Sequence, residues 1–295
     1  MHYLRQGRGF YRNAIALMLP MILQNLVTNF MALADTFMVG ILGETELAAV
    51  SMANSVFFVL SLVIFGIQSG TGVLVAQYYG KGRLDAINRI MGMGYYVSIG
   101  LTAVVALLAC LFPMQMMRIV TNNPDLWEPG AEYARIVGFS YVCMSFSGVY
   151  IAVQRSMENP KLGAILLTVS GALNILLNYM LIFGKLGAPA MGCAGAAVAT
   201  LISRAFEVVV ILGCMLWSKR LPINPRLMAK PGKLIAGDFM KYSLPVVLNE
   251  GFWSLAMSLF TVIMGHMAAS GDLIAAYTVA GSIDKLSTAG IYGIA

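Results

Sequence analysis

The segment FMALADTFMVGIL, residues 30–42, places one acidic side chain, Asp35, inside an otherwise apolar run. The apolar character continues upstream to about residue 13. An ionised carboxylate at the centre of a membrane helix costs about 2.5–3.5 kcal/mol on insertion scales, and such residues face protein or water rather than lipid. We therefore expect a membrane-spanning helix here, with Asp35 on a face that other parts of the chain cover.

The composition of the whole chain points the same way. It has 295 residues, of which 59% are hydrophobic and 11% charged, and its mean hydropathy is +0.79. Soluble domains carry about 25% charged residues, so a large soluble domain is excluded and an all-α polytopic membrane protein is expected. A spanning helix needs about 20 apolar residues. Such stretches lie near residues 13–40, 47–76, 90–112, 132–154, 162–184, 191–217, 241–268 and 271–295.

The basic residues between these stretches are distributed unequally. Fourteen Lys and Arg residues fall on one side of the expected membrane, and three, Arg118, Arg135 and Lys185, fall on the other. Because cytoplasmic loops are enriched in Lys and Arg, we expect a multi-pass protein of the inner (plasma) membrane with a cytoplasmic N-terminus. The net charge of +6 is spread between hydrophobic runs rather than gathered in one patch, which argues against a nucleic acid partner.

The chain contains an internal repeat. Leu19-Pro20-Met21 recurs as Leu244-Pro245-Val246, and the segment 38–56 can be laid over 263–283 with Gly40 opposite Gly265. Both copies begin on the same side of the membrane, as a parallel duplication of a six-helix unit requires. We therefore expect a six-helix lobe at 1–217, a cytoplasmic linker at 218–240, and the first two helices of an incomplete second lobe at 241–295.

Polar residues form a stripe on the first expected helix. At 100° per residue, Gln24, Asn25, Thr28 and Asp35 fall on one arc, and large apolar side chains fill the opposite side. Asn174 and Asn178 lie one turn apart on the fifth helix and are expected neighbours of Asp35, because amides in hydrocarbon need partners. The stripe predicts a polar cavity; a hydrogen-bonded seam between helices is the alternative.

Two further helices carry polar groups. On the sixth, Thr200, Ser203, Arg204 and Glu207 share one face. We interpret Arg204 and Glu207 as a structural ion pair, three residues apart and close to the cytoplasmic end. On the seventh, Glu250 is the acidic member of a stripe that also contains Ser243, Ser254, Met257 and Thr261. Glu250 therefore suggests a second cation-responsive group, and Met257 is expected in an adaptable, apolar substrate cavity together with Gln24, Asn25 and Thr28.

The chemistry of a carboxylate among amides suits cation coupling. Such a group can bind and release a proton, or it can hold sodium together with carbonyl and hydroxyl oxygens; Asp35, Asn174 and Asn178 would be the sodium ligands. One elementary charge moved across 100 mV supplies about 2.3 kcal/mol, enough to bias an equilibrium between two conformations more than tenfold. We expect no cofactor other than the coupling ion, H⁺ or Na⁺.

Enzymatic motifs are absent from the sequence. His2 and His266 are its two histidines, and neither H-E-x-x-H nor G-x-S-x-G occurs. Cys110, Cys143, Cys193 and Cys214 lie in apolar segments with no metal-site spacing, so they are expected to be free packing residues. An intramembrane enzyme that uses two acids stays a distant alternative.

Four segments together resemble the multidrug and toxic compound extrusion family. They are ADTFMVGILGETELAAVS (34–51), GIQSGTGVLVAQYYGKG (66–82), NILLNYMLIFGKLGAPAMGCAGAAVATLIS (174–203) and LPVVLNEGFWSL (244–255). The resemblance implies a fold of two six-helix lobes that exports organic cations and other amphipathic compounds in exchange for protons or sodium. By position, it implies that Asp35, Asn174, Asn178 and Thr200 form the cation cluster of the first lobe and that Glu250 is the acid of the seventh helix.

The resemblance also bears on what the chain could do. Twelve helices are implied and the chain stops in the eighth, so we expect a fragment or a truncated form. The expected partners are the lipid bilayer and small amphipathic or cationic substrates, with the protein acting as a monomer. Besides a drug antiporter, a flippase for a lipid-linked oligosaccharide or cell-wall precursor stays open; it would need a more cationic cavity. Asp284 and Lys285 are left without a role.

Overall fold

The computed structural model describes residues 8–218 and 221–265, and these are almost entirely helical. The helices follow one another along the chain as α1 (Arg8–Gly40), α2 (Glu44–Gly80), α3 (Leu84–Leu111), α4 (Pro113–Val120), a 3₁₀ turn η2 (Pro124–Leu126), α5 (Trp127–Ser156), α6 (Pro160–Phe183), α7 (Gly192–Trp217), α8 (Pro225–Ala229) and α9 (Lys233–Gly265). The expected all-α class is confirmed.

Six of these segments are long and apolar enough to cross a membrane. They are Met18–Gly40, Glu44–Gly80, Leu84–Leu111, Pro124–Ser156, Pro160–Phe183 and Gly192–Trp217. The expected spans of the first lobe are thus confirmed as helices, and the chain is a multi-pass membrane protein. The seventh expected span corresponds to α9, which begins at Lys233 rather than near 241. The eighth expected span, 271–295, lies outside the described residues, as do Asp284 and Lys285.

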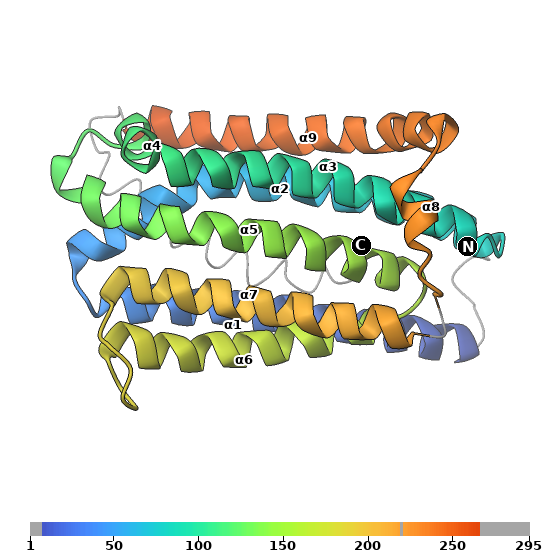
Figure 1. The fold of residues 1–295 in the computed structure, drawn as a ribbon, viewed down its shortest axis with the longest axis horizontal. Helices are drawn as coiled ribbons and strands as arrows, with labels where there is room; N and C mark the ends of the chain where they lie inside the picture. The colour runs from blue at the N-terminus through green and yellow to red at the C-terminus, as the bar shows by residue number, and fades with distance from the viewer. Residues whose placement is uncertain (1–7, 219–220, 266–295) are drawn as a thin grey trace.

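The helices form an elongated bundle around α5, which packs against α2, α3 and α7. On one flank α7 contacts α6, and α6 contacts α1; on the other, α2 contacts α9 (Figure 1). The start of α1, the end of α7 and the short α8 lie at the same end of the bundle (Figure 1). We call this the basic end, because the turns around it carry Lys81, Arg83, Arg155 and Lys161.

Two apolar cores follow one another along the length of the bundle. The core toward the basic end contains Ile87, Met91 and Tyr150, and the core toward the opposite end contains Phe57, Met117 and Val137. Between them lie buried polar side chains, which we call the polar layer: Ser98, Thr102, Ser145, Ser147, Ser170, Asn178, Ser203 and Glu207. In a membrane such groups must find partners within the protein, so the polar layer is where function is to be sought.

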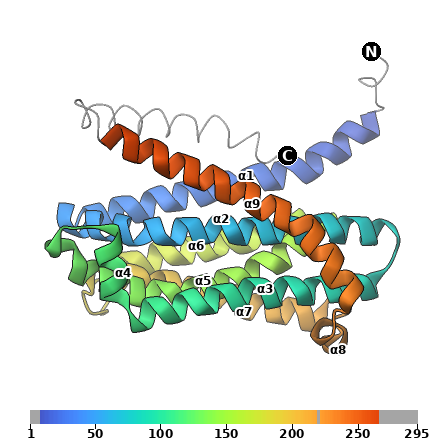
Figure 2. The same cartoon turned by 90° about the horizontal axis from the view of Figure 1, so that it is seen from above.

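Helix α9 crosses α2 obliquely (Figure 2) and at close range. A Cβ atom added at Gly66 would lie 2.8 Å from the Cα atom of Val247, and one at Gly70 would overlap Ser243. Small residues allow membrane helices to approach in this way. Each of the two helices that the repeat brings into correspondence contains an internal proline, Pro20 in α1 and Pro245 in α9. This likeness supports the internal repeat.

Candidate functional site

Asp35 of α1 meets Asn178 of α6 within the polar layer. Asn178 is fully buried, and its Nδ2 donates a hydrogen bond of 2.6 Å to Asp35 Oδ1. Gly171 leaves room for the Met31 side chain where α1 contacts α6, because a Cβ atom there would overlap that side chain. The expected proximity of Asp35 to the amides of α6 is therefore confirmed.

The hydrogen bonds continue from α6 to α7. Asn178 Nδ2 also lies 3.3 Å from Asn174 Oδ1, and Asn174 Nδ2 lies 3.4 Å from Thr200 Oγ1. Asn174 and Asn178 can form this chain because residues four apart lie on the same face of a helix. The structure thus brings four of the predicted residues together from three helices. Their roles in coupling stay predictions.

A cavity of about 280 Å³ opens beside this cluster. Its walls come from α1, α2, α5, α6 and α7, and its lining residues are Thr28, Met31, Ala32, Asp35, Asn54, Tyr133, Val137, Ser140, Tyr141, Met144, Asn174, Thr200, Ser203 and Arg204. The lining combines one acid, one base, amides, hydroxyls and apolar surface. We call it the Asp35 cavity.

One oxygen atom at the cluster has no partner. Asn178 Oδ1 is buried and accepts no hydrogen bond from any described residue. Buried polar atoms are nearly always satisfied, and an unsatisfied carbonyl oxygen beside a carboxylate is a suitable ligand for a hard cation. The residues present therefore fit a sodium ion or a proton at Asp35. Among the described residues, no group of three or more His, Cys, Asp or Glu side chains could hold a metal ion.

Arg204 and Glu207 of α7 form an ion pair of 2.8 Å. The predicted pairing is confirmed, but the predicted position close to the cytoplasmic end is wrong. The pair lies in the middle of α7, where Glu207 also accepts hydrogen bonds from Ser147 and Ser170. The error arose because hydropathy alone does not show how far a charged pair lies from the end of a long helix.

The other predicted residues lie in different places. Thr28 lines the Asp35 cavity, whereas Gln24 and Asn25, one turn earlier in α1, are not among its lining residues. Glu250 is half-buried on α9 and does not line this cavity. The side chain of Met257 lies outside the part of the chain for which side chains are described. For these residues the assigned roles stay predictions.

Sequence reasoning missed several lining residues. Tyr133 is buried and its hydroxyl lies 3.3 Å from Asn54 Oδ1; Tyr141 stacks on Phe57, with ring centroids 4.7 Å apart. Asn54 carried a usable signal, because an amide in the middle of an apolar span is as unusual as Asn174. The two tyrosines carried none, because aromatic residues are ordinary in membrane helices.

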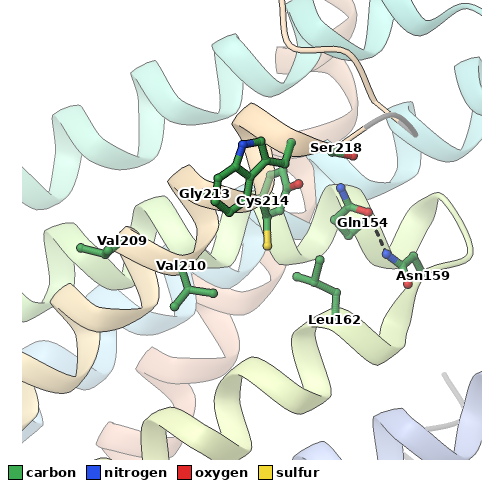
Figure 3. Close-up of a pocket in the computed structure, with 10 residues that line it drawn as sticks. Gln154, Asn159, Leu162, Val209, Val210, Gly213, Cys214 and Ser218 are labelled. Atoms are coloured by element: carbon green, nitrogen blue, oxygen red, sulfur yellow. Dashed lines mark hydrogen bonds between the residues drawn. The ribbon is translucent and has the colours of Figure 1, made fainter.

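A larger groove of about 590 Å³ lies near the basic end, between α5, α6 and α7 (Figure 3). Its polar groups include Gln154 and Asn159, whose side chains are hydrogen-bonded at 3.1 Å, and much of the remaining wall is apolar, with Leu162, Val209 and Val210 (Figure 3). None of the described residues that line this groove is charged. The Asp35 cavity is therefore the better candidate for a site that responds to cations.

Comparison with known proteins agrees with the family resemblance of the sequence. Residues 20–180 match the family model MatE. The "Probable multidrug resistance protein NorM" of Thermotoga maritima is 27% identical over 287 residues, which is 96% of this chain and 60% of that protein. The "Multidrug resistance protein MdtK" of Photorhabdus laumondii is 27% identical, with 92% and 60% covered. The chain spans about 60% of the length of these two relatives.

Solved structures share the fold. One described as an outward-facing conformation of a multidrug resistance MATE family transporter superposes with a TM-score of 0.85 at 24% identity, over 96% of this chain and 62% of that one. A MATE structure in complex with MaL6 gives a TM-score of 0.86 at 24% identity, with the same coverage. At this identity the likeness concerns the arrangement of the helices.

Proposed function

This chain belongs to the MatE family, and on that premise we propose that it forms part of a cation-coupled antiporter that exports organic cations and drugs by alternating access. The family is one of transporters rather than enzymes, which leaves the intramembrane enzyme without support. The names of its relatives, multidrug resistance proteins, support the substrate class.

The observation that carries the proposal is the environment of Asp35. Its carboxylate lies in a cavity, accepts a hydrogen bond from Asn178, and has the unpartnered Asn178 Oδ1 beside it. A simple packing seam would satisfy that oxygen. Asp35 is thus a negative charge that faces a space large enough for an ion and is adjoined by a ligand atom that is still free.

Coupling follows from competition for this charge. A proton or sodium ion at Asp35 and the ammonium group of a substrate each neutralise the same carboxylate, so binding of one weakens binding of the other. A ligand shifts a conformational equilibrium by its difference in affinity between the two states. If the ion prefers one conformation and the substrate the other, the ion gradient drives export.

The ion itself can be H⁺ or Na⁺. For sodium, Asp35, Asn174 and Asn178 would supply oxygen ligands, with Thr200 Oγ1 next in the hydrogen-bonded chain. For a proton, Asp35 is the acceptor. Glu250 on α9 would respond to the same gradient in the second lobe. Gln24, Asn25, Thr28 and Met257 are proposed to contact substrate.

The topology and assembly complete the proposal. The basic end would face the cytoplasm of a cell whose inner (plasma) membrane holds the protein, which acts as a monomer. Residues 1–217 would form the first lobe, 218–240 the linker, and 241–295 the start of the second lobe. The unequal distribution of Lys and Arg and the prolines inside α1 and α9 support this division.

A flippase for a lipid-linked precursor is less well supported. Such substrates carry phosphate groups, which require a cationic cavity. The Asp35 cavity contains one arginine, Arg204, and its charge is already paired with Glu207. The described lining therefore carries no excess of positive charge that could bind such phosphates.

Ethidium export by cells that express the complete gene product tests the proposal. Asp35→Asn keeps the size and polarity of the side chain but removes its charge, so export should fall to the level of cells without the protein. Asp125→Asn, which changes an exposed acid at the start of a 3₁₀ turn, is the control and should leave export unchanged. Export that persists in Asp35→Asn would refute the assignment.

A further inference from the structure

Glu207 is a buried acid to which the proposed coupling mechanism assigns no role. It is 0% exposed, and its carboxylate is bonded from three helices. Ser147 Oγ of α5 donates to Oε2 at 2.9 Å, Ser170 Oγ of α6 donates to Oε1 at 2.7 Å, and Arg204 Nη1 of α7 donates to Oε1 at 2.8 Å. An ionised carboxylate accepts hydrogen bonds only, and each of these three partners can donate. The three contacts therefore suit a negative charge at Glu207.

The partner of this acid reaches the Asp35 cavity. The side chain of Arg204 is 27% exposed and is one of the lining residues, whereas Glu207 is not. A guanidinium stays charged under all ordinary conditions. Without a partner, Arg204 would act as a counter-ion for Asp35 and would repel any cation that enters.

We propose that Glu207 determines the charge selectivity of the cavity, because it neutralises Arg204 and leaves Asp35 as the uncompensated charge. This inference rests on the proposed function and deepens it: the cavity accepts cations because an acid behind its wall cancels the base in its wall. Glu207 does not touch the substrate and acts through Arg204.

The other groups that face the cavity do not change this balance. From α5 come the phenols Tyr133 and Tyr141, from α2 the amide Asn54, and from α6 the amide Asn174. Asp35 and Arg204 are the charged residues of the described lining, and Glu207 brings the sum to one negative charge. Removal of the Glu207 charge makes the sum zero, and removal of the Arg204 charge makes it two negative charges.

The test uses two size-matched probes of opposite charge, tetraphenylphosphonium and tetraphenylborate, and the complete gene product in nanodiscs at one fixed pH, with empty nanodiscs as background. In Glu207→Gln, tetraphenylphosphonium affinity should fall about tenfold, as expected for one unit charge several ångströms away in a medium of intermediate dielectric, and tetraphenylborate affinity should rise. Arg204→Gln should shift both affinities in the opposite direction. The double variant should return to the wild-type preference, because its sum is again one negative charge.

An electrostatic effect changes the affinities for the two probes in opposite directions, whereas damage to the fold lowers both. If Glu207 were a structural residue alone, every variant would bind both probes more weakly, and the double variant would be the worst; that result would overturn the inference. If Glu207→Gln alone does not fold, comparison of Arg204→Gln with the double variant still isolates the Glu207 charge: tetraphenylphosphonium affinity should be about tenfold lower in the double variant, and equal affinities would overturn the inference. Wild type and Asp35→Asn are measured in parallel. Cation binding that survives in Asp35→Asn would refute the proposed function, whereas unchanged probe preference in the Glu207 and Arg204 variants would refute this inference alone.

Discussion

Asn178 Nδ2 lies 2.6 Å from Asp35 Oδ1, although the two residues are 143 positions apart in the chain. The bond fixes the acid of α1 against the amide of α6 and leaves Asn178 Oδ1 free. Coupling is proposed to depend on this pair, because Asp35 lines the cavity and the unpartnered oxygen belongs to the amide that is hydrogen-bonded to it.

Replacement of Asn178 should weaken ion coupling. If sodium is the coupling ion, Asn178→Ala removes one of its proposed oxygen ligands and should raise the sodium concentration needed for half-maximal export by about ten- to a hundredfold. Thr200→Val, at the far and longer end of the chain of bonds (3.4 Å), should have a smaller effect. Ion titration of ethidium export in proteoliposomes measures both; equal effects would show that distance from Asp35 does not matter.

The hydroxyls that bind Glu207 should stabilise the bundle. Ser147→Ala and Ser170→Ala each remove one of its donors, and each should lower the free energy of unfolding by about 1–3 kcal/mol. Ser55→Ala is the matched control, because the exposed Ser55 hydroxyl bonds to the carbonyl of Met52 in its own helix. Thermal unfolding in detergent gives the comparison, and a loss in Ser55→Ala as large as in the others would contradict the account.

The close contact of α2 with α9 should not tolerate a larger residue. A methyl group at Gly66 would lie 2.8 Å from the Cα atom of Val247, so Gly66→Ala should force the helices apart and lower the melting temperature. Gly100→Ala on α3 is the control, since nothing lies within 4 Å of a Cβ there. It should be neutral or stabilising by up to about 1 kcal/mol, because Ala is the better helix former. Destabilisation by both would point to a cause other than packing.

Asn88 attaches the segment around α8 to α3. It is buried, its Nδ2 donates to the carbonyl of Pro222 at 3.0 Å, and its Oδ1 accepts from the amide of Asn224 at 3.1 Å. In Asn88→Ala both backbone groups lose their partner, at a cost of about 1–3 kcal/mol each. Trypsin should therefore cleave after Arg226 at least tenfold faster than in wild type. The exposed Asn122→Ala serves as control, and equal cleavage rates would show that Asn88 does not hold this segment.

Much of the fold could be predicted from the sequence, because membrane helices are read from runs of apolar residues. Six spans and the pairing of Asp35 with Asn178 follow from hydropathy and from the need of buried polar groups for partners. The start of α9 at Lys233 did not follow, because the stretch before residue 241 is not apolar although it is helical. Hydropathy marks where a helix enters lipid and not where the helix begins.

The cavity was less predictable than the cluster. Its tyrosines gave no signal, and the depth of Arg204 and Glu207 was misjudged because periodicity gives the face of a helix but not the neighbours at a given height. The hydroxyls of Ser147 and Ser170 come from other helices, and their approach to Glu207 depends on packing across three segments. Contacts among side chains of three different helices can be recognised only in the three-dimensional structure.

Counter-transport in proteoliposomes tests the central claim most directly. The complete gene product, wild type or Asp35→Asn, is reconstituted with ethidium, and ethidium movement is followed under an imposed proton gradient and, separately, an imposed sodium gradient. The account predicts that one of the two gradients drives ethidium against its own gradient in wild type and that neither does so in Asp35→Asn. Uphill ethidium transport of equal rate in both proteins would contradict it.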